Sequence, residues 1–151
     1  MILGEHINDS NRYDIQLKGA GRTPYSGSGD GKATVSSMLR EYIYSYAMHN
    51  LRVNSSRSLA VIETDESVKR RQTEPGAILV RVMNSHIRYG TFQYVASRVP
   101  DELESFTEYV IDRHYPHLND SDAKYVEFFD AVMRASIEMV VEWLRVGFIH
   151  G

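Results

Sequence analysis

The sequence predicts an α+β protein, in which a small mixed sheet with one inserted helix is followed by an all-helical region. Short apolar runs of the kind that form strands occur in the first half of the chain. Apolar residues at helical spacing separate them over residues 33–51, and the same spacing continues from Thr91 onward. With 151 residues, the chain is long enough for one ordinary domain or for a piece of a larger one.

The first predicted strand leads directly into a glycine-rich loop. Tyr13, Ile15 and Leu17 alternate with polar residues, which is typical of a half-buried strand and places Lys18 at its end, on the polar face. Residues 18–32 then hold five of the ten glycines. This segment is therefore predicted to be a loop.

A helix and two further strands follow the loop. Residues 33–51 lack glycine and proline and place their bulkier apolar residues at helical spacing, which predicts an amphipathic helix. The apolar runs at residues 58–63 and 77–83 are predicted to be neighbouring antiparallel strands. A polar stretch and the turn signal Glu74-Pro75-Gly76 separate them.

The remaining chain is predicted to be helical. A short segment at residues 92–96 precedes helices at residues 101–115 and at about 121–146, and Gly147 ends the last helix. The apolar face of this helix comprises Val126, Phe129, Val132, Met133, Ile137, Val140, Val141 and Leu144. Residues 144–151 then enter a new apolar segment without a polar tail, which indicates that the chain is a piece of a longer one.

Composition excludes several function classes. The 17 Lys and Arg residues against 20 Asp and Glu give a net charge of −3, too mild to direct the chain toward nucleic acid or an anionic membrane. The absence of cysteine excludes disulfides, thiolate zinc sites and cysteine nucleophiles. Because there is neither an export signal nor an apolar stretch that would span a bilayer, we expect a soluble, non-exported protein.

The glycine-rich loop is a candidate phosphate cradle, because backbone amides and a helix N-terminus can approach phosphate oxygens where no side chain intervenes. It matches neither common fingerprint. A Walker A motif requires glycine at Ser26 and Ser or Thr at Ala33, and a dinucleotide-binding motif starting at Gly19 requires glycine at Pro24. The loop is therefore either a cradle of another kind or a flexible connection.

Two pairs of charged residues are candidates for binding an anion. Lys18 at the strand end and Glu41 in the next helix suit a lysine that a carboxylate holds against nucleotide phosphates. Arg81 interrupts an apolar strand and Arg88 follows seven residues later, which suits capture of one anion by two guanidinium groups. The alternative is that all four are solvated surface charges.

The histidines and tyrosines do not predict a site. His114 and His117 lack the helical His-Glu-x-x-His context of a zinc site, and the other four histidines are scattered. The ten tyrosines lack the basic surroundings that a nucleic-acid platform requires. We therefore expect no metal ligands in this chain and no nucleic-acid partner.

Several motifs, in sequence order, resemble the selenoprotein O family. The most specific is Leu17-Lys18-Gly19-Ala20-Gly21-x-Thr23-Pro24-Tyr25-Ser26, followed by Gly29-Asp30-Gly31 and Arg40-Glu41. Further along the chain come Ala47-Met48-His49, Arg81-Val82, Ser85-His86-Ile87-Arg88-Tyr89-Gly90 and Val146-Gly147-Phe148-Ile149-His150-Gly151. The resemblance covers essentially the whole chain.

The resemblance implies a protein-kinase-like fold, long called a pseudokinase, and transfer of AMP from ATP to Ser, Thr or Tyr hydroxyls of protein substrates. ATP lies inverted in this family relative to ordinary kinases, which leaves the α-phosphorus open to attack. The implied cofactors are ATP and Mg²⁺ or Mn²⁺, and no membrane partner is implied. The implied location is the cytoplasm, or the mitochondrion if the source is eukaryotic.

The resemblance also assigns roles to the candidate residues. Lys18 matches the nucleotide-binding strand lysine, and Glu41 matches its ion-pair partner on the helix equivalent to the kinase C-helix. Asp30 and Gly31 match positions that contact the nucleotide. The arginines that hold the phosphates in this family correspond to Arg81 and Arg88.

The same resemblance implies an internal fragment. Residues 1–100 are expected to form most of the nucleotide-binding N-lobe, and residues 101–151 the first helices of the C-lobe, whose apolar faces we expect to be exposed. The family's carboxylate base and metal ligands follow the motif that ends at Gly151, so that no catalytic or metal residue is expected in the chain. Lys32 stands where the family usually has arginine and keeps the charge without the guanidinium fork.

Other functions remain open from the sequence. The main alternative is a catalytically dead kinase-fold remnant that binds nucleotide or acts as a scaffold. Transfer of UMP in place of AMP is compatible with the same residues. An ordinary Ser/Thr kinase is disfavoured, because the His-Arg-Asp signature is absent and the loop after Lys18 is placed differently.

Overall fold

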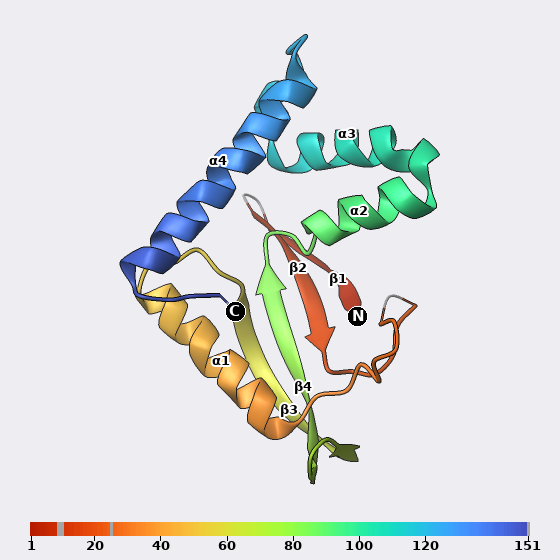
Figure 1. Ribbon diagram of the computed structural model, residues 1–151, viewed down its shortest axis with the longest axis vertical. Helices are drawn as coiled ribbons and strands as arrows, with labels where there is room; N and C mark the ends of the chain where they lie inside the picture. Colours follow the sequence, from red (N-terminus) through yellow and green to blue (C-terminus); the bar gives the residue numbers. More distant parts are fainter. Residues whose placement is uncertain (9–10, 25, 151) are drawn as a thin grey trace. The chain divides into compact units, whose positions relative to one another are not determined.

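The computed structural model describes residues 1–8, 11–24 and 26–150. The chain divides into two compact units, Met1–His86 and Ile87–Gly151, of which the first contains the sheet and the second is helical (Figure 1). Among the residues that the structure describes, no helix is long and apolar enough to cross a membrane. The sequence places its lobe boundary near residue 100, and that assignment of lobes stays a prediction.

The sheet of the first unit has the strand order β1-β2-β4-β3. Its strands are β1 (Ile2–Asn8), β2 (Asn11–Lys18), β3 (Arg57–Lys69) and β4 (Thr73–Met83). All neighbouring pairs are antiparallel, so that the expectation of a mixed sheet was wrong. Strand β1 was not predicted, because its apolar residues Ile2 and Leu3 are adjacent in the sequence and do not alternate with polar ones.

Helix α1 (Val35–Asn50) confirms the predicted amphipathic helix. Its first turn is closed by a capping box, in which Thr34 and Ser37 exchange side-chain to backbone hydrogen bonds. The helix packs on β3 and β4 (Figure 1). Met38 is buried there against Ala77 and Leu79, which form the centre of the core.

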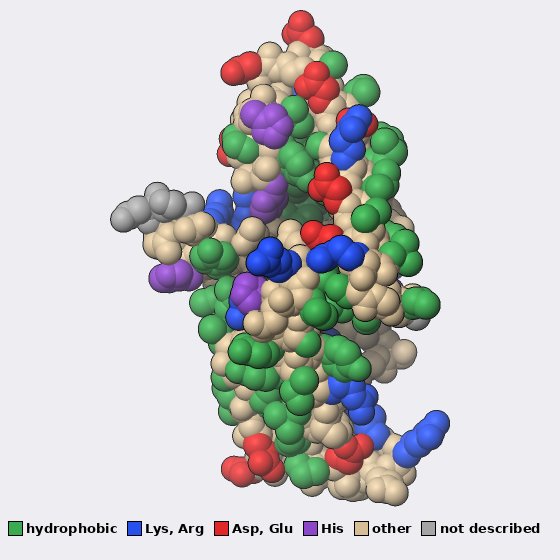
Figure 2. Space-filling model, turned by 90° about the vertical axis from the view of Figure 1, so that its left-hand side faces the viewer, with side chains coloured by type: hydrophobic (Ala, Val, Ile, Leu, Met, Phe, Trp, Pro, Cys, Tyr) green, Lys and Arg blue, Asp and Glu red, His purple; other side chains and the backbone are tan. Residues whose placement is uncertain are grey.

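The outer side of α1 keeps large apolar side chains in contact with solvent. Ile43 is 63% exposed and Tyr46 is 61% exposed. Figure 2 shows hydrophobic side chains gathered over the lower part of the face on which α1 lies. Only the inner side of this helix therefore contributes to the core of the first unit.

The turn between β3 and β4 lies at residues 70–72, where the Arg70 backbone N–H donates to the Gln72 carbonyl at 2.9 Å. The predicted turn at Glu74-Pro75-Gly76 was therefore wrong. Pro75 lies in β4, beyond the stretch that pairs with β2, and Gly76 faces an irregularity in β3. A Cβ on Gly76 would lie 2.7 Å from Thr64 Oγ1, so that glycine serves a close backbone approach here rather than a turn.

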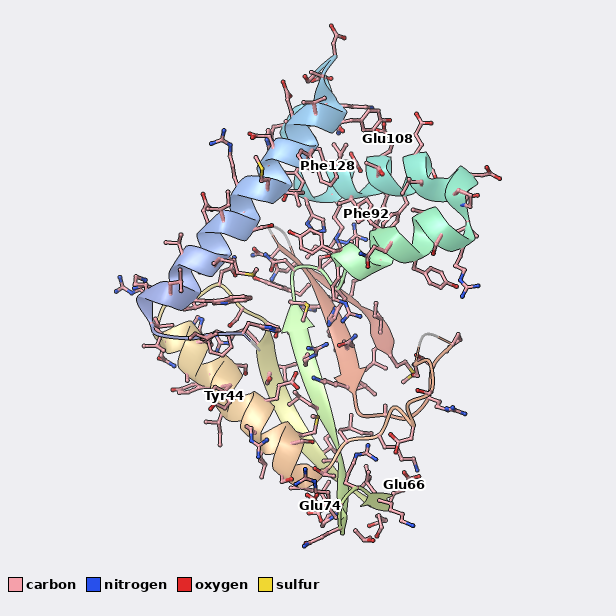
Figure 3. The ribbon with its side chains drawn as sticks, viewed as in Figure 1. Tyr44, Glu66, Glu74, Phe92, Glu108 and Phe128 are labelled. Atoms are coloured by element: carbon pink, nitrogen blue, oxygen red, sulfur yellow. The ribbon has the colours of Figure 1, made fainter. Side chains whose placement is uncertain are left out.

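The second unit contains the predicted helices α2 (Tyr89–Arg98), α3 (Leu103–His114) and α4 (Lys124–Arg145). Aromatic rings link them: the ring centroid of Phe92 lies 4.8 Å from that of Phe106 and 6.2 Å from that of Phe128 (Figure 3). The predicted apolar face of α4 is exposed, with Val126 at 71% and Phe129 at 70%. This exposure confirms the expectation drawn from the sequence.

Candidate functional site

The strand register places the first candidate residues on one face of the sheet. Gln16 of β2 stands opposite Arg81 of β4, and Lys18 stands opposite Leu79. Leu79 is the buried residue under α1. Because side chains alternate between the faces of a strand, Gln16, Lys18 and Arg81 all point to the face that α1 covers over β3 and β4.

Glu41 of α1 completes this group, which we call the Glu41 cluster: Lys18, Glu41 and Arg81. The Lys18 ammonium donates to Oε2 of Glu41, and Nη1 of Arg81 donates to Oε1 at 3.3 Å. The predicted pairing of Lys18 with Glu41 is thus formed. One carboxylate is thus shared by two cations.

Gln16 holds the guanidinium of Arg81 from the other side. Nε and Nη2 of Arg81 both donate to Oε1 of Gln16, the first at 3.0 Å. With Glu41 on Nη1, the arginine side chain is fixed at three nitrogens and is only 19% exposed. Gln16 was not predicted from the sequence. Its position on the polar side of β2 identifies it as a partner of Arg81 only when the register of β2 with β4 is known.

Asp14, in the middle of β2, and His86, which follows β4, form a buried pair. The Asp14 carboxylate accepts the backbone N–H of His86 at 2.8 Å, and its Oδ2 lies 3.5 Å from Nδ1 of the imidazole. Burial, together with the positive charge of Arg81, lowers the pKa of His86 below its ordinary value of 6.5. The imidazole of His86, which is the last residue of the first unit, is therefore neutral at pH 7.

The glycine-rich loop is closed on itself. Ala20 and Lys32 form an isolated antiparallel bridge, and the Gly21 N–H donates to the Gly31 carbonyl at 3.1 Å. Gly31 has a φ of +67°, and a Cβ there would lie 2.1 Å from the Gly21 carbonyl oxygen. These contacts favour a loop with a defined conformation over a flexible connection. Tyr25 of the family motif lies outside the described residues, as does Gly151.

Asp30 is bound to the hairpin that joins β3 to β4. Arg70 donates Nη1 to Oδ2 at 2.7 Å and Nη2 to Oδ1 at 2.9 Å. The Lys32 backbone N–H also donates to Oδ1, at 3.0 Å. The Arg70 hydrogen bonds, followed by the Lys32 backbone hydrogen bond, lower the pKa of Asp30 to about 2. A shallow hollow of about 380 Å³ lies over the loop and is lined by Arg22, Ser28, Asp30 and Lys32.

Arg88 belongs to the second unit, where it precedes α2 as the N-cap residue. Its backbone N–H donates to Oγ1 of Thr91 at 3.2 Å, and its side chain is exposed. The structure thus brings together Lys18, Glu41 and Arg81, and it places Asp30 and Gly31 in the adjoining loop. It does not test the joint action of Arg81 with Arg88.

The sequence predicts no metal ligands in this chain, and the structure gives the arrangement of the side chains of the described residues. They gather no group of three or more His, Cys, Asp or Glu side chains that would hold a metal ion. Glu41 and Asp30, the carboxylates of the candidate site, are both bound to arginine or lysine side chains. The described residues therefore do not fit a resident divalent metal.

Comparison with known proteins gives one consistent result. The family model described as protein adenylyltransferase SelO matches residues 2–151. The chain is 52% identical, over 99% of its length, to a protein named protein nucleotidyltransferase YdiU from Nitrosococcus oceani, and 53% identical, over its whole length, to the protein of that name from Alcanivorax borkumensis. The identity to the Clostridium perfringens protein of the same name is 51%. The chain spans 31%, 32% and 31% of these relatives, respectively.

Proposed function

The chain belongs to the protein adenylyltransferase SelO family, and from this premise we propose that it carries much of the nucleotide-binding part of an enzyme that transfers AMP from ATP to hydroxyl side chains of proteins. The proposed fold is protein-kinase-like, with residues 1–100 as most of the N-lobe and residues 101–151 as the start of the C-lobe. The antiparallel sheet, with α1 inserted between β2 and β3, supports this assignment.

The single observation that carries the proposal is the Glu41 cluster. A carboxylate shared by Lys18 and Arg81 keeps both cations in place. Lys18 remains 45% exposed, so that an anion can reach its ammonium group. Nucleotide phosphates are the anions that such a preplaced pair of a lysine and an arginine suits.

In the proposed reaction, a protein hydroxyl oxygen attacks the α-phosphorus and the bond to the bridging oxygen of pyrophosphate breaks. Lys18 and Arg81 hold the outer phosphates, where negative charge develops as pyrophosphate leaves. A cluster that is already assembled requires little reorganisation at that moment. Arg88 is assigned to the same phosphates, and Asp30 and Gly31 to nucleotide contact, on the family resemblance.

The hydroxyl proton has to be accepted by a general base, and the divalent metal, Mg²⁺ or Mn²⁺, needs oxygen ligands. We place both in the remainder of the protein, because the described residues provide neither a fitting metal cluster nor a carboxylate of the candidate site without a cationic partner. This chain therefore contributes binding and orientation of the nucleotide.

The proposal is tested by ATP binding to the 151-residue chain, measured by calorimetry. Lys18→Ala is compared with Lys124→Ala, which removes a lysine from another Lys–Glu pair, 2.7 Å from Glu108 in the second unit. We expect Lys18→Ala to weaken ATP binding by about tenfold or more, and Lys124→Ala to leave it unchanged. Equal binding by all three proteins contradicts the assignment of Lys18.

The transfer itself is tested with the complete gene product that contains this chain. After incubation with ATP, Mg²⁺ or Mn²⁺ and candidate protein substrates, mass spectrometry is expected to show AMP on Ser, Thr or Tyr. Nucleotide binding without any transfer favours the alternative of a nucleotide-binding scaffold. Incubation with UTP in a parallel sample distinguishes AMP transfer from UMP transfer.

A further inference from the structure

Arg70 connects the glycine-rich loop to the rest of the first unit. It follows β3 directly and donates to both carboxylate oxygens of Asp30. Its Nη2 also donates to the Lys32 carbonyl at 2.8 Å, and its Nη1 to the Lys69 carbonyl at 2.9 Å. A planar guanidinium can make these contacts at the same time, whereas a single ammonium group cannot reproduce the bidentate geometry.

A second contact reinforces this connection. The Lys32 ammonium donates to Oε2 of Glu66 at 2.8 Å, and Glu66 lies on the part of β3 near the hairpin turn (Figure 3). The two ends of the segment at residues 30–32 are thus held by the β3–β4 hairpin. Between them lies Gly31, whose positive φ and close approach to the Gly21 carbonyl oxygen fix the course of the loop.

The Asp30 carboxylate has little capacity left for a ligand. An ionised carboxylate offers about four lone-pair positions, and three of those of Asp30 accept hydrogen bonds from Arg70 and from the Lys32 backbone. Its negative charge would also oppose a polyphosphate if Arg70 did not neutralise it. The geometry suits an anchor for the loop better than a direct ligand of the phosphates, and it therefore does not favour the Asp30 carboxylate as the group that makes the nucleotide contact implied by the family resemblance.

We propose that Arg70 is a positioning residue for the nucleotide: by clamping Asp30 and the Lys32 carbonyl to the β3–β4 hairpin, it holds residues 30–32 of the glycine-rich loop in the conformation that accepts ATP. This inference rests on the proposed function for its ligand. The contact of Arg70 with the loop is independent of the proposed function. Loss of the clamp is expected to lower ATP affinity, because binding then has to order the loop.

The test compares Arg70→Ala with Arg71→Ala, which removes an equal charge from the neighbouring position without removing the ion pair. In the complete gene product, Arg70→Ala is expected to raise the KM for ATP by about tenfold, with kcat changed less than about twofold. In the 151-residue chain, it is expected to accelerate tryptic cleavage after Arg22. Arg71→Ala is expected to change neither quantity.

Arg70→Lys separates charge from geometry. The lysine keeps the charge but loses the fork, and we expect a KM between those of the wild-type protein and Arg70→Ala. A KM of Arg70→Lys equal to that of the wild-type protein contradicts the bidentate clamp. Equal KM values and equal cleavage rates for Arg70→Ala and Arg71→Ala overturn the proposal. If the wild-type protein does not bind ATP, the proposed function fails, and the cleavage rates still decide whether Arg70 anchors the loop.

Discussion

Two groups of charged side chains in the first unit differ in how their charges are matched. In the Glu41 cluster, one carboxylate is shared by Lys18 and Arg81. At the loop, Arg70 and Asp30 match each other one to one, with both carboxylate oxygens bound. The first group thus gathers two cations around one carboxylate, whereas the second is a one-to-one pair that holds the backbone of the loop in place.

The two groups also differ in what fixes their geometry. The Glu41 cluster lies on paired strands and a capped helix, and Arg81 is held by Gln16 as well. The loop clamp is an exposed pair that connects a loop to a hairpin turn. Exposed pairs are screened by salt, so that we expect the loop to respond to ionic strength more than the cluster does.

The largest effect is expected from Gly31→Ala. A Cβ would lie 2.1 Å from the Gly21 carbonyl oxygen at a φ of +67°, and the combined overlap and backbone strain cost roughly 3 kcal/mol or more. ATP binding should be lost with the loop conformation. Gly27→Ala is the matched control, because its φ of +57° is similar but no atom lies within 4 Å of the added Cβ. Chemical denaturation and calorimetry measure both variants, and equal losses of stability contradict this account.

Gln16→Leu should have a smaller effect on the Glu41 cluster. It removes the acceptor for two nitrogens of Arg81, so that the guanidinium is less well oriented toward an anion. We expect a loss of ATP affinity of roughly threefold to fivefold, corresponding to the net contribution of about one hydrogen bond. Gln93→Leu on the exposed side of α2 is the control. An unchanged affinity in Gln16→Leu shows that Arg81 does not depend on this contact.

The clamp can be examined through the titration of Asp30. In the wild-type chain the Arg70 hydrogen bonds lower the pKa of Asp30 from 3.8 to about 2, and in Arg70→Ala we expect it to return toward 3.8. Because the folded-state pKa is the lower one, the stabilisation by this pair is present above pH 3.8 and is lost as the pH falls toward 2. Carboxyl NMR measures the midpoint, and an identical midpoint in both proteins contradicts the clamp.

His86 makes the stability of the first unit depend on pH. Its pKa is lower in the folded protein than the ordinary value of 6.5, so that the unfolded chain binds the proton more readily. Stability should therefore decrease as the pH falls below 6.5, by at most about 1.4 kcal/mol per pH unit from this group. His86→Gln should flatten this part of the curve of unfolding free energy against pH. The same slope in both proteins would show that His86 does not titrate as described.

The elements that sequence patterns predicted well are those with strong local periodicity. Alternation at Tyr13, Ile15 and Leu17 located β2, and spacings of three and four located α1 and the helices of the second unit. The hairpin turn was misplaced because Pro75 and Gly76 are usual turn residues, whereas here they lie in β4. Gly76 is required here by tertiary packing, since it lies against the β3 backbone and the Thr64 side chain.

The candidate site also contains residues that were predicted from the sequence and residues that were not. The pairing of Lys18 with Glu41 was predicted from the resemblance to the selenoprotein O family, whereas the residues alone left solvated surface charges as the alternative. Gln16 and Arg70 were not predicted. Their partners, Arg81 and Asp30, lie 65 and 40 residues away, and only the register of β2 with β4 and the position of the hairpin turn bring them together.

The central claim, that the Glu41 cluster binds nucleotide phosphates, is tested most directly by the ratio of affinities for ATP and AMP. Calorimetry on the 151-residue chain and on Arg81→Ala gives both affinities. We predict that the wild-type chain binds ATP more tightly than AMP and that Arg81→Ala loses most of this preference, because the cluster contacts the phosphates that AMP lacks. An unchanged ratio in Arg81→Ala would contradict the claim.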